Sequence, residues 1–342
     1  MIEKNRGKTL RLGLIGFGYW GPNLFRNFSN LHGVQILRIA DQNEIQLKAL
    51  RHSYPNVDLS ADYRKLLADD NIDAIVLATP VSTHFVMAKQ ALSAGKHVFV
   101  EKPLATSSRH CQALIRIAKK SNKILMVGHT FEYHPAVRKI GELIKSGSFG
   151  KLRYIDAVRV NLGRYQSDGK NVLWDLAPHD LSIILHWTGK MPTEVSARGK
   201  GFVKSSVEDV VFITLEFPDG ALAHIHLSWL APAKLRKMTI VGSKKMILYD
   251  DLENFEKIKI ADRSAHLDPG SQRARVNYRL GDIVSPYVEY KEPLALECAH
   301  FVECIRDCRQ PLTDAANGLR VVKIIEAASL SLKQNGRTVH IT

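Results

Sequence analysis

The sequence predicts an α/β protein: an N-terminal doubly wound parallel sheet, followed by an α+β domain with a large, mostly antiparallel open sheet. Three observations predict this architecture. An apolar strand at 10–15 runs into a Gly-x-Gly-x-x-Gly motif and then into a helix. Strand-like and helix-like segments alternate through the first third of the 342 residues. After about residue 130 longer strand-like segments follow one another without helices, which is typical of antiparallel sheets.

We place the first domain at 1–128. Short apolar runs such as 74–78 and 124–127 suit parallel strands that helices cover on both faces. Strands are predicted near 10–15, 34–40, 73–78, 96–100 and 123–127. Helices are predicted near 21–31, 43–51, 61–69, 82–94 and 106–120. Such alternation implies right-handed crossovers, with ligands bound beyond the carboxyl ends of the strands.

We place the second domain at 129–342, with its last segment a candidate for packing back on the first domain. Strands are predicted near 151–161, 193–201, 207–217, 221–230, 235–241, 245–250 and 337–341. The sequence Phe217-Pro218-Asp219-Gly220 predicts a hairpin turn. We expect the charged stretch 262–290 to be a long loop or excursion, because it contains several arginines and turn-forming dipeptides. Helices are predicted near 294–309 and 314–335.

The glycine motif predicts a dinucleotide site. Gly16 permits a tight turn, Gly18 lets a diphosphate approach the backbone, and Gly21 lets the helix pack closely on the strand. Free amides at the start of the helix then face the phosphates. The loop residues that we assign to the cofactor are Gly16, Phe17, Gly18, Tyr19 and Trp20.

Asp41 indicates which cofactor is bound. It ends the strand at 34–40, about twenty residues past the glycines, where an acid hydrogen-bonds the ribose 2′-hydroxyl. A carboxylate there repels a 2′-phosphate, so NAD is favoured over NADP. The alternative is a glycine-rich turn in another kind of α/β protein. The order of strand, glycines, helix, strand and acid argues against that alternative.

Charge and composition limit the partners. The formal net charge is +14, from 48 Lys and Arg against 34 Asp and Glu. Nucleic-acid binding would need basic residues clustered with aromatic residues, and we find no such stripe. A solvated basic surface and attraction of an anionic substrate both remain open. No apolar run is long enough to span a membrane. Because residues 1–8 lack the apolar core of a signal peptide, we expect a cytoplasmic protein.

We expect no metal site. Cys304 and Cys308 lie one helical turn apart, and His224 and His226 alternate on a predicted strand. Either pair suggests a metal ligand set, but neither is accompanied by clear further ligands. We interpret the cysteines as small apolar residues of a helix. The histidines then lie on a sheet face covered by water or by a second subunit.

Two further loops follow predicted strands of the first domain. One reads Thr79-Pro80-x-x-x-His84, and the other reads Glu101-Lys102-Pro103. Proline restricts the residue before it, so Lys102 is locally constrained. Its ammonium could donate a hydrogen bond to a substrate oxygen and offset negative charge as a hydroxyl loses its proton. A surface lysine is the alternative for this loop taken alone.

The second domain supplies a candidate base in Asp175-x-x-x-His179. Pro178 fits the first turn of a helix, so we expect Asp175 to be its N-cap. Residues four apart share a helix face. An imidazole can accept the proton that leaves a hydroxyl during oxidation. On spacing alone, a capping aspartate with an incidental histidine is an equal alternative.

Together these motifs resemble the Gfo/Idh/MocA oxidoreductases over nearly the whole chain. The resemblance implies an NAD-binding Rossmann domain, Lys102 and His179 on either side of the substrate, and His179 as general base assisted by Asp175. It also implies a cis Lys102–Pro103 bond, and association as a homodimer or homotetramer through the open sheet face. The cofactor residues outside the glycine loop would then be Asp41, Thr79, Pro80, His84, Glu101 and Lys102.

A finer resemblance connects the segments 18–23 and 174–180 with family members that act on nucleotide sugars, the UDP-N-acetylglucosamine 3-dehydrogenase type. It implies oxidation of a ring hydroxyl, at C3, of UDP-N-acetylglucosamine or its uronate in surface polysaccharide or lipid A biosynthesis. The candidate substrate contacts are His129, Tyr133, Arg159 and Arg164.

Three alternatives stay open. They are a dehydrogenase of free polyols or aldoses such as inositol, an NAD-dependent glycosidase, and a catalytically silent NAD-binding regulator. The presence of both Lys102 and His179 argues against the regulator.

Overall fold

The computed structural model describes residues 9–163, 170–267 and 276–341. The chain forms two compact units. The first contains Met1–Tyr133 and Lys291–Val322, and the second contains His134–Tyr290 and Lys323–Thr342. The first unit is therefore built from two separate stretches of chain, whereas the sequence suggested two consecutive domains that meet at residue 128.

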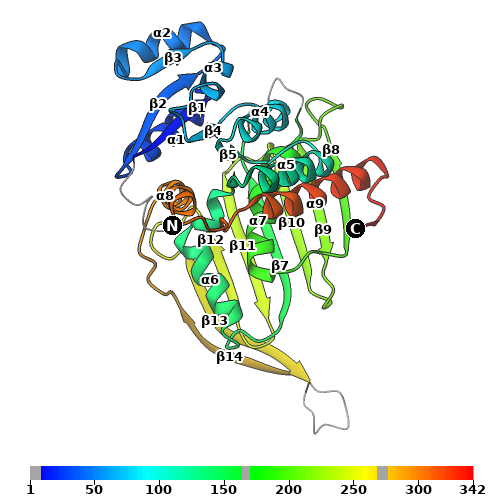
Figure 1. The fold of residues 1–342 in the computed structure, drawn as a ribbon. Coiled ribbons are helices and arrows are strands. Elements are labelled where there is room, and N and C mark those ends of the chain that lie inside the picture. Colours follow the sequence, from blue (N-terminus) through cyan, green and yellow to red (C-terminus); the bar gives the residue numbers. More distant parts are fainter. Residues whose placement is uncertain (1–8, 164–169, 268–275, 342) are drawn as a thin grey trace. The chain divides into compact units, whose positions relative to one another are not determined.

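The first unit contains a six-stranded parallel sheet in the order β3-β2-β1-β4-β5-β6 (Figure 1). This is the strand order of the dinucleotide-binding fold, and it confirms the predicted doubly wound sheet. The strands are β1 (Leu10–Ile15), β2 (Val34–Ala40), β3 (Asp58–Ser60), β4 (Ala74–Leu77), β5 (His97–Glu101) and β6 (Leu125–Gly128). Every residue of β4 and of β6 is buried, as expected for parallel strands.

Helices connect these strands and complete the first unit. They are α1 (Gly21–Ser29), α2 (Glu44–Ser53), α3 (Arg64–Leu67), α4 (Val81–Ser93), α5 (Ser108–Ser121), the 3-10 helix η2 (Thr130–Tyr133) and α8 (Pro293–Arg306). Helix α8 comes from the returning chain, and its Phe301 packs edge-on against Phe28 of α1 and Phe99 of β5. All three rings are fully buried. The returning segment is thus part of the core of the first unit.

The second unit contains a nine-stranded sheet in the order β14-β13-β12-β11-β7-β10-β9-β8-β15, in which only β7 and β10 pair in parallel. This confirms the predicted, mostly antiparallel sheet. The strands are β7 (Leu152–Val160), β8 (Glu194–Lys200), β9 (Val210–Glu216), β10 (Leu222–Ser228), β11 (Leu235–Gly242), β12 (Met246–Asp250), β13 (Ile258–Leu267), β14 (Val276–Val284) and β15 (Val339–His340). The predicted hairpin turn joins β9 to β10, with Gly220 at a φ of 79°.

Helices cover one face of this sheet. Helix α7 (Val172–Thr188) packs on β7, β9 and β10, and α6 (Pro135–Lys145) packs on α7. The indole N–H of Trp187 joins the two helices by donating to the Val137 carbonyl at 2.9 Å. Helix α9 (Ala315–Lys333) begins in the first unit and ends in the second. In the part of the chain that is described, no helix is long and apolar enough to cross a membrane.

For the second unit, one sequence expectation was wrong and one helix was missed. The described part of 262–284 is not a loop, because the end of β13 and the whole of β14 form paired strands at one edge of the sheet (Figure 1). Edge strands tolerate charged residues, and those charges made the stretch look like a loop. Helix α6 was not predicted at all. Pro135 in its first turn and the side-chain N-cap His134, which accepts from the Ala136 N–H, are the signals that could have revealed it.

Helix α7 begins earlier than expected. Its N-cap is Asn171, whose side chain accepts from the Trp174 N–H at 3.2 Å, so the prediction that Asp175 caps the helix was wrong. Pro178 lies inside the helix instead of in its first turn. A proline there removes one backbone hydrogen bond, and the long apolar stripe of α7 buried against the sheet compensates for that loss.

We predict that Pro178→Ala stabilises the protein by up to about 3 kcal/mol, because alanine restores the missing backbone donor. Urea unfolding measures the change. Pro293→Ala is the matched control, since Pro293 lies in the first turn of α8, where no intrahelical bond is lost, and its stability should change little. Equal stability of Pro178→Ala and wild type would mean that the helix already compensates fully.

Candidate functional site

The glycine loop after β1 depends on close backbone contacts at Gly16 and at Gly21. Gly16 has a φ of 91°, and a Cβ at this position would lie 2.6 Å from the Ala78 carbonyl oxygen. A Cβ on Gly21 would lie 2.6 Å from the Gly16 carbonyl oxygen. Both positions therefore require glycine. At Gly18, by contrast, an added Cβ meets no described atom within 4 Å, so the backbone there faces open space.

This loop fits a diphosphate. Helix α1 starts at Gly21, and its N-cap residue Trp20 makes no side-chain capping bond. Pro22 has no N–H, and the Asn23 N–H donates to the Trp20 carbonyl at 3.0 Å, so α1 offers an anion mainly the positive end of its dipole. Open space at Gly18 next to a helix N-terminus is what a dinucleotide diphosphate requires. Tyr19 is almost fully exposed beside this space, whereas Phe17 is buried.

Asp41 follows β2 and is tied to the same loop. Its carboxylate accepts the Phe17 N–H at 2.6 Å and the Asn43 N–H at 2.8 Å. These bonds hold the carboxylate beside the glycine loop, and each carboxylate oxygen keeps a further lone pair for another donor. Asp41 thus lies where an adenosine ribose hydroxyl could donate to it.

The loops after β4 and β5 are held together by His84. The two ring nitrogens of this buried histidine lie 2.9 Å from the Pro103 carbonyl oxygen and 2.8 Å from the Thr79 carbonyl oxygen. With only 1% of its surface exposed, His84 has no face for a cofactor. The expectation that His84 binds the cofactor was therefore wrong, and the ring instead positions the loops that carry Thr79, Pro80 and Lys102.

The Glu101-Lys102-Pro103 segment has the geometry that the family resemblance implied. The Lys102–Pro103 peptide bond is cis. The Glu101 carboxylate accepts the Lys102 N–H at 3.2 Å and lies against Gly128, the last residue of β6. Burial raises the pKa of Glu101 to about 7, although the Lys102 ammonium acts to lower it. The Glu101 carboxyl, which lies beside the Lys102 ammonium, therefore changes its protonation state near neutral pH.

A second buried acid, which the sequence analysis missed, lies in the same unit. Glu297 on α8 is fully buried and accepts the Thr130 hydroxyl at 2.7 Å. Burial and the neighbouring Glu101 both raise the pKa of Glu297 well above its usual range. An acidic residue within the apolar run Leu294-Ala295-Leu296-Glu297-Cys298 was the available signal.

His129 and Tyr133 follow β6 in the same buried region. Among the described residues, neither ring nitrogen of His129 has a hydrogen-bond partner. Burial, together with the nearby Lys102 ammonium, lowers the pKa of His129 to about 3, so the ring is neutral. Tyr133 is fully buried with its hydroxyl 3.1 Å from the Thr313 hydroxyl, and burial raises its pKa. The expectation that Tyr133 lines a sugar pocket is therefore not met.

In the second unit, α7 carries the candidate base. Asp175 and His179 lie one turn apart on this helix, and both are partly exposed. The Asp175 carboxylate accepts the indole N–H of Trp229 at 3.2 Å. This bond ties the first turn of α7 to the end of β10. The predicted pairing of Asp175 and His179 on one helix is present, although Asp175 does not cap that helix.

Arg159 does not fit its predicted role. Its side chain is 4% exposed, and its guanidinium donates to both carboxylate oxygens of Asp180 at 2.7–3.0 Å. The carboxylate fixes Arg159 under α7, so the arginine is not a diphosphate contact. Arg164 lies outside the described residues. Within residues 9–163, 170–267 and 276–341, no group of three or more His, Cys, Asp or Glu residues could hold a metal ion.

Comparison with known proteins identifies both parts of the chain. Residues 10–129 match the family model described as "Oxidoreductase family, NAD-binding Rossmann fold". Residues 137–248 match the model described as "GFO/IDH/MocA C-terminal domain". The two matches are consecutive, and together they cover most of the described residues.

Relatives and solved structures agree with these matches. UDP-N-acetylglucosamine 3-dehydrogenase of Acidithiobacillus ferrooxidans is 28% identical over 95% of this chain and 96% of its own. A solved structure of the enzyme of that name and organism has a TM-score of 0.80 at 26% identity, covering 95% of this chain and 98% of its own. Myo-inositol 2-dehydrogenase of Thermotoga maritima is 24% identical over 95% of this chain and 97% of its own.

We predict that the Glu101→Gln variant gains stability relative to wild type as the pH rises. Below the unfolded pKa near 4.5, the wild-type carboxyl is neutral in both states. Between pH 4.5 and about 7 the carboxyl ionises in the unfolded state but stays protonated in the folded state, so the wild type loses stability across this range and the loss is complete above pH 7. The unfolding free energy of the variant relative to wild type should increase by more than about 1 kcal/mol between pH 5 and pH 8.

Urea unfolding at the two pH values measures this difference. Glu44→Gln, at an exposed position on α2, is the control and should show the same stability relative to wild type at both. A Glu101→Gln difference that does not change with pH would show that Glu101 titrates normally.

Proposed function

Because the chain belongs to the Gfo/Idh/MocA family of oxidoreductases, we propose that it oxidises a ring hydroxyl, at C3, of a nucleotide-linked sugar such as UDP-N-acetylglucosamine or its uronate. The family assignment makes it a nicotinamide-dependent oxidoreductase acting on CH–OH groups. The proposed substrate rests on its similarity, over almost the full length of both chains, to a UDP-N-acetylglucosamine 3-dehydrogenase. The product would serve surface polysaccharide or lipid A biosynthesis. The net charge of +14 also suits a substrate with a diphosphate.

We assign the chemical roles residue by residue. When bound, the nicotinamide accepts the hydride that leaves the carbon. His179 accepts the hydroxyl proton, because a neutral imidazole is a competent base near pH 7. Asp175 orients the helix turn that bears His179. Lys102 donates a hydrogen bond to the substrate oxygen and stabilises the negative charge that develops there. His129 is neutral but, like His84 and Tyr133, it is almost fully buried, so we assign it no substrate contact.

A second candidate is a dehydrogenase of free polyols, which the similarity to a myo-inositol 2-dehydrogenase favours. Incubation of the purified protein with NAD and a panel of UDP-sugars, free sugars and polyols distinguishes the two. NADH formation with UDP-N-acetylglucosamine or its uronate supports the proposal. NADH formation with polyols alone supports the second candidate. Release of a free glycan without net NADH would indicate a glycosidase.

We predict that Lys102→Ala and His179→Ala each lower kcat by about 10²–10⁴-fold, because each removes a group that acts on the reacting oxygen. The Kd for NAD should stay within a few-fold of wild type. Steady-state kinetics and NAD titration measure the two effects. Lys120→Ala, at an exposed position on α5, should behave as wild type. Wild-type kcat in either catalytic variant contradicts the corresponding role.

The cofactor is proposed to be NAD. Asp41→Asn removes the negative charge while leaving an oxygen for the Phe17 N–H. We predict that this variant uses NADP at least about tenfold better relative to NAD than wild type does, because the repulsion of a 2′-phosphate is removed. Ratios of kcat/KM measure the selectivity. Asp70→Ala, an exposed acid of the same unit, should leave the ratio unchanged. An unaltered ratio in Asp41→Asn would remove Asp41 from the ribose site.

We further propose a homodimer or homotetramer that forms through the open face of the second sheet. Neighbouring strands place apolar side chains on this face, since Leu222 pairs with Tyr154 and both are nearly half exposed. On the same face, Phe212 stacks on His226 with ring centres 4.5 Å apart. Leu248 on β12, which β11 separates from β7, is 52% exposed. Exposed apolar side chains on one face of a sheet commonly mark an interface between subunits.

We predict that Leu222→Glu together with Leu248→Glu dissociates the protein into monomers of 38.4 kDa, because two charges would have to be buried. Light scattering during size-exclusion chromatography measures the mass. Phe255→Glu, which changes a 90% exposed side chain after β12, should leave the mass unaltered. A monomeric wild type would contradict the oligomer.

A further inference from the structure

Asp180, the residue directly after His179 on α7, is one of the most completely buried acids of the described chain. Its side chain is 2% exposed, and Arg159 of β7 donates to it through Nε at 2.9 and 3.0 Å and through a terminal nitrogen at 2.7 Å. These three contacts fix the direction of the Asp180 carboxylate as well as its distance from the Arg159 guanidinium. The pair therefore fixes one side of α7 to one strand of the sheet beneath it.

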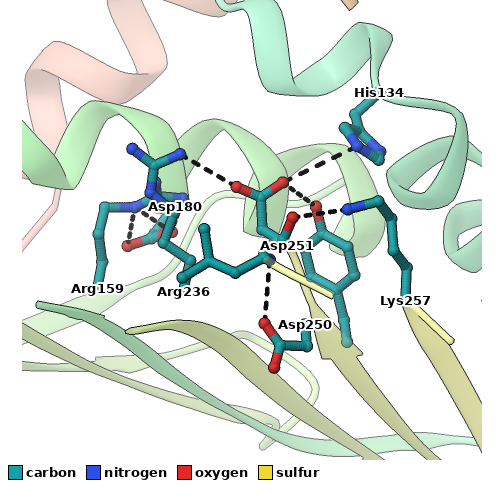
Figure 2. A network of polar contacts seen from close by, with 9 residues as sticks. His134, Arg159, Asp180, Arg236, Asp250, Asp251 and Lys257 are labelled. Atoms are coloured by element: carbon teal, nitrogen blue, oxygen red, sulfur yellow. Dashed lines mark hydrogen bonds and ion pairs between the residues drawn. The ribbon is translucent and has the colours of Figure 1, made fainter. Parts of the chain in front are cut away.

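Arg159 is part of a larger charged cluster, shown in Figure 2. In the register of β7 and β11, Arg159 lies directly opposite Arg236. Two like charges in that relation repel each other. Arg236 donates to Asp251 at 3.1 Å, and the Tyr249 hydroxyl also donates to Asp251, at 3.0 Å. Each arginine thus has its own carboxylate, one from α7 and one from the end of β12.

This arrangement makes the position of α7 costly to change. If α7 rotated or slid, Arg159 would stay buried without its hydrogen-bonded carboxylate while facing a second arginine. Asp251 and Asp180 both raise the pKa of Arg159 against the effect of burial, so the guanidinium stays charged. The constraint on Asp180 is therefore electrostatic as well as steric.

Asp180 and Asp175 hold α7 on both sides of His179. Asp175, one turn before the histidine, accepts the Trp229 indole N–H at 3.2 Å. Asp180 follows the histidine and is rotated about 100° from it around the helix axis. With Asp180 directed into the sheet at Arg159, the direction of His179 on the helix is set.

We propose that Arg159 and Asp180 are a positioning pair that fixes the orientation of His179 for proton transfer. The inference rests on the proposed role of His179 as the base. Neither partner touches the substrate, and both act through the helix. The pair should therefore affect kcat, because the alignment of base and hydroxyl decides the rate of the chemical step, while cofactor binding depends on other residues.

The test compares Asp180→Asn with Asp251→Asn. Both replace a buried carboxylate of one cluster by an isosteric amide, but only the first lies on α7. We expect both to lower the thermal midpoint. Asp180→Asn should lower kcat about 10²-fold, the effect of a misplacement of about 1 Å, with the Kd for NAD unchanged. Asp251→Asn should keep kcat within a few-fold of wild type. Arg159→Lys, which keeps the charge but cannot make the same three contacts, should give an intermediate kcat.

A wild-type kcat in Asp180→Asn, or an equal loss in both asparagine variants, overturns the proposal. If Asp180→Asn does not fold, an unreduced kcat in Arg159→Lys overturns it. Loss of kcat in His179→Ala but not in Asp180→Asn leaves the proposed function intact and removes only the positioning role. Crystal structures give a readout that needs no substrate: the His179 imidazole should shift by about 1 Å in Asp180→Asn and stay in place in Asp251→Asn.

Discussion

The close approach of Gly16 to Ala78 is the constraint from which the first unit is organised. A side chain at Gly16 would put a carbon 2.6 Å from the Ala78 carbonyl oxygen, so the turn after β1 can press against the end of β4 only if that residue is glycine. Because β1 and β4 pair in parallel, their carboxyl ends then open at one edge of the sheet. The loops that carry the predicted cofactor residues Asp41 and Lys102 follow strands that end at this same edge. One steric condition thus prepares a diphosphate site and brings the loops together around it.

The second unit depends on a different kind of constraint. Its sheet is apolar on the side that α7 covers, and two arginines nevertheless lie there side by side across β7 and β11. Burying charges in this way is not an efficient source of stability, since well-packed apolar groups often do as well. Removing one partner of such a pair, however, costs about 3–5 kcal/mol. The cluster therefore favours one position of α7 on the sheet and penalises the others, and α7 is the helix that carries His179.

Much of this architecture could be predicted from the sequence, and the exceptions share a cause. The glycine motif and the alternation of apolar segments identified every long strand of the first sheet, because those signals are local. β14 was misread because an edge strand keeps its charged residues in solvent. Pro178 was misread because the packing of α7 outweighs the local preference of proline. Motifs singled out Lys102, His179 and Asp41, and the roles given to these residues stay predictions. The partners of Arg159 and Glu297 were not, since Asp180 and Thr130 lie on other elements and only folding brings them together.

The return of the chain to the first unit has a consequence for how this protein can be divided. A polypeptide ending after Tyr133 would contain all six parallel strands but not α8, and Phe28 and Phe99 would lose the ring of Phe301 that buries them. Helix α9 then continues without a break from the first unit into the second. No single cut yields two autonomous folding pieces. A chimera that exchanges the nucleotide-binding half with a relative would have to carry both stretches, with one of its junctions placed inside a helix.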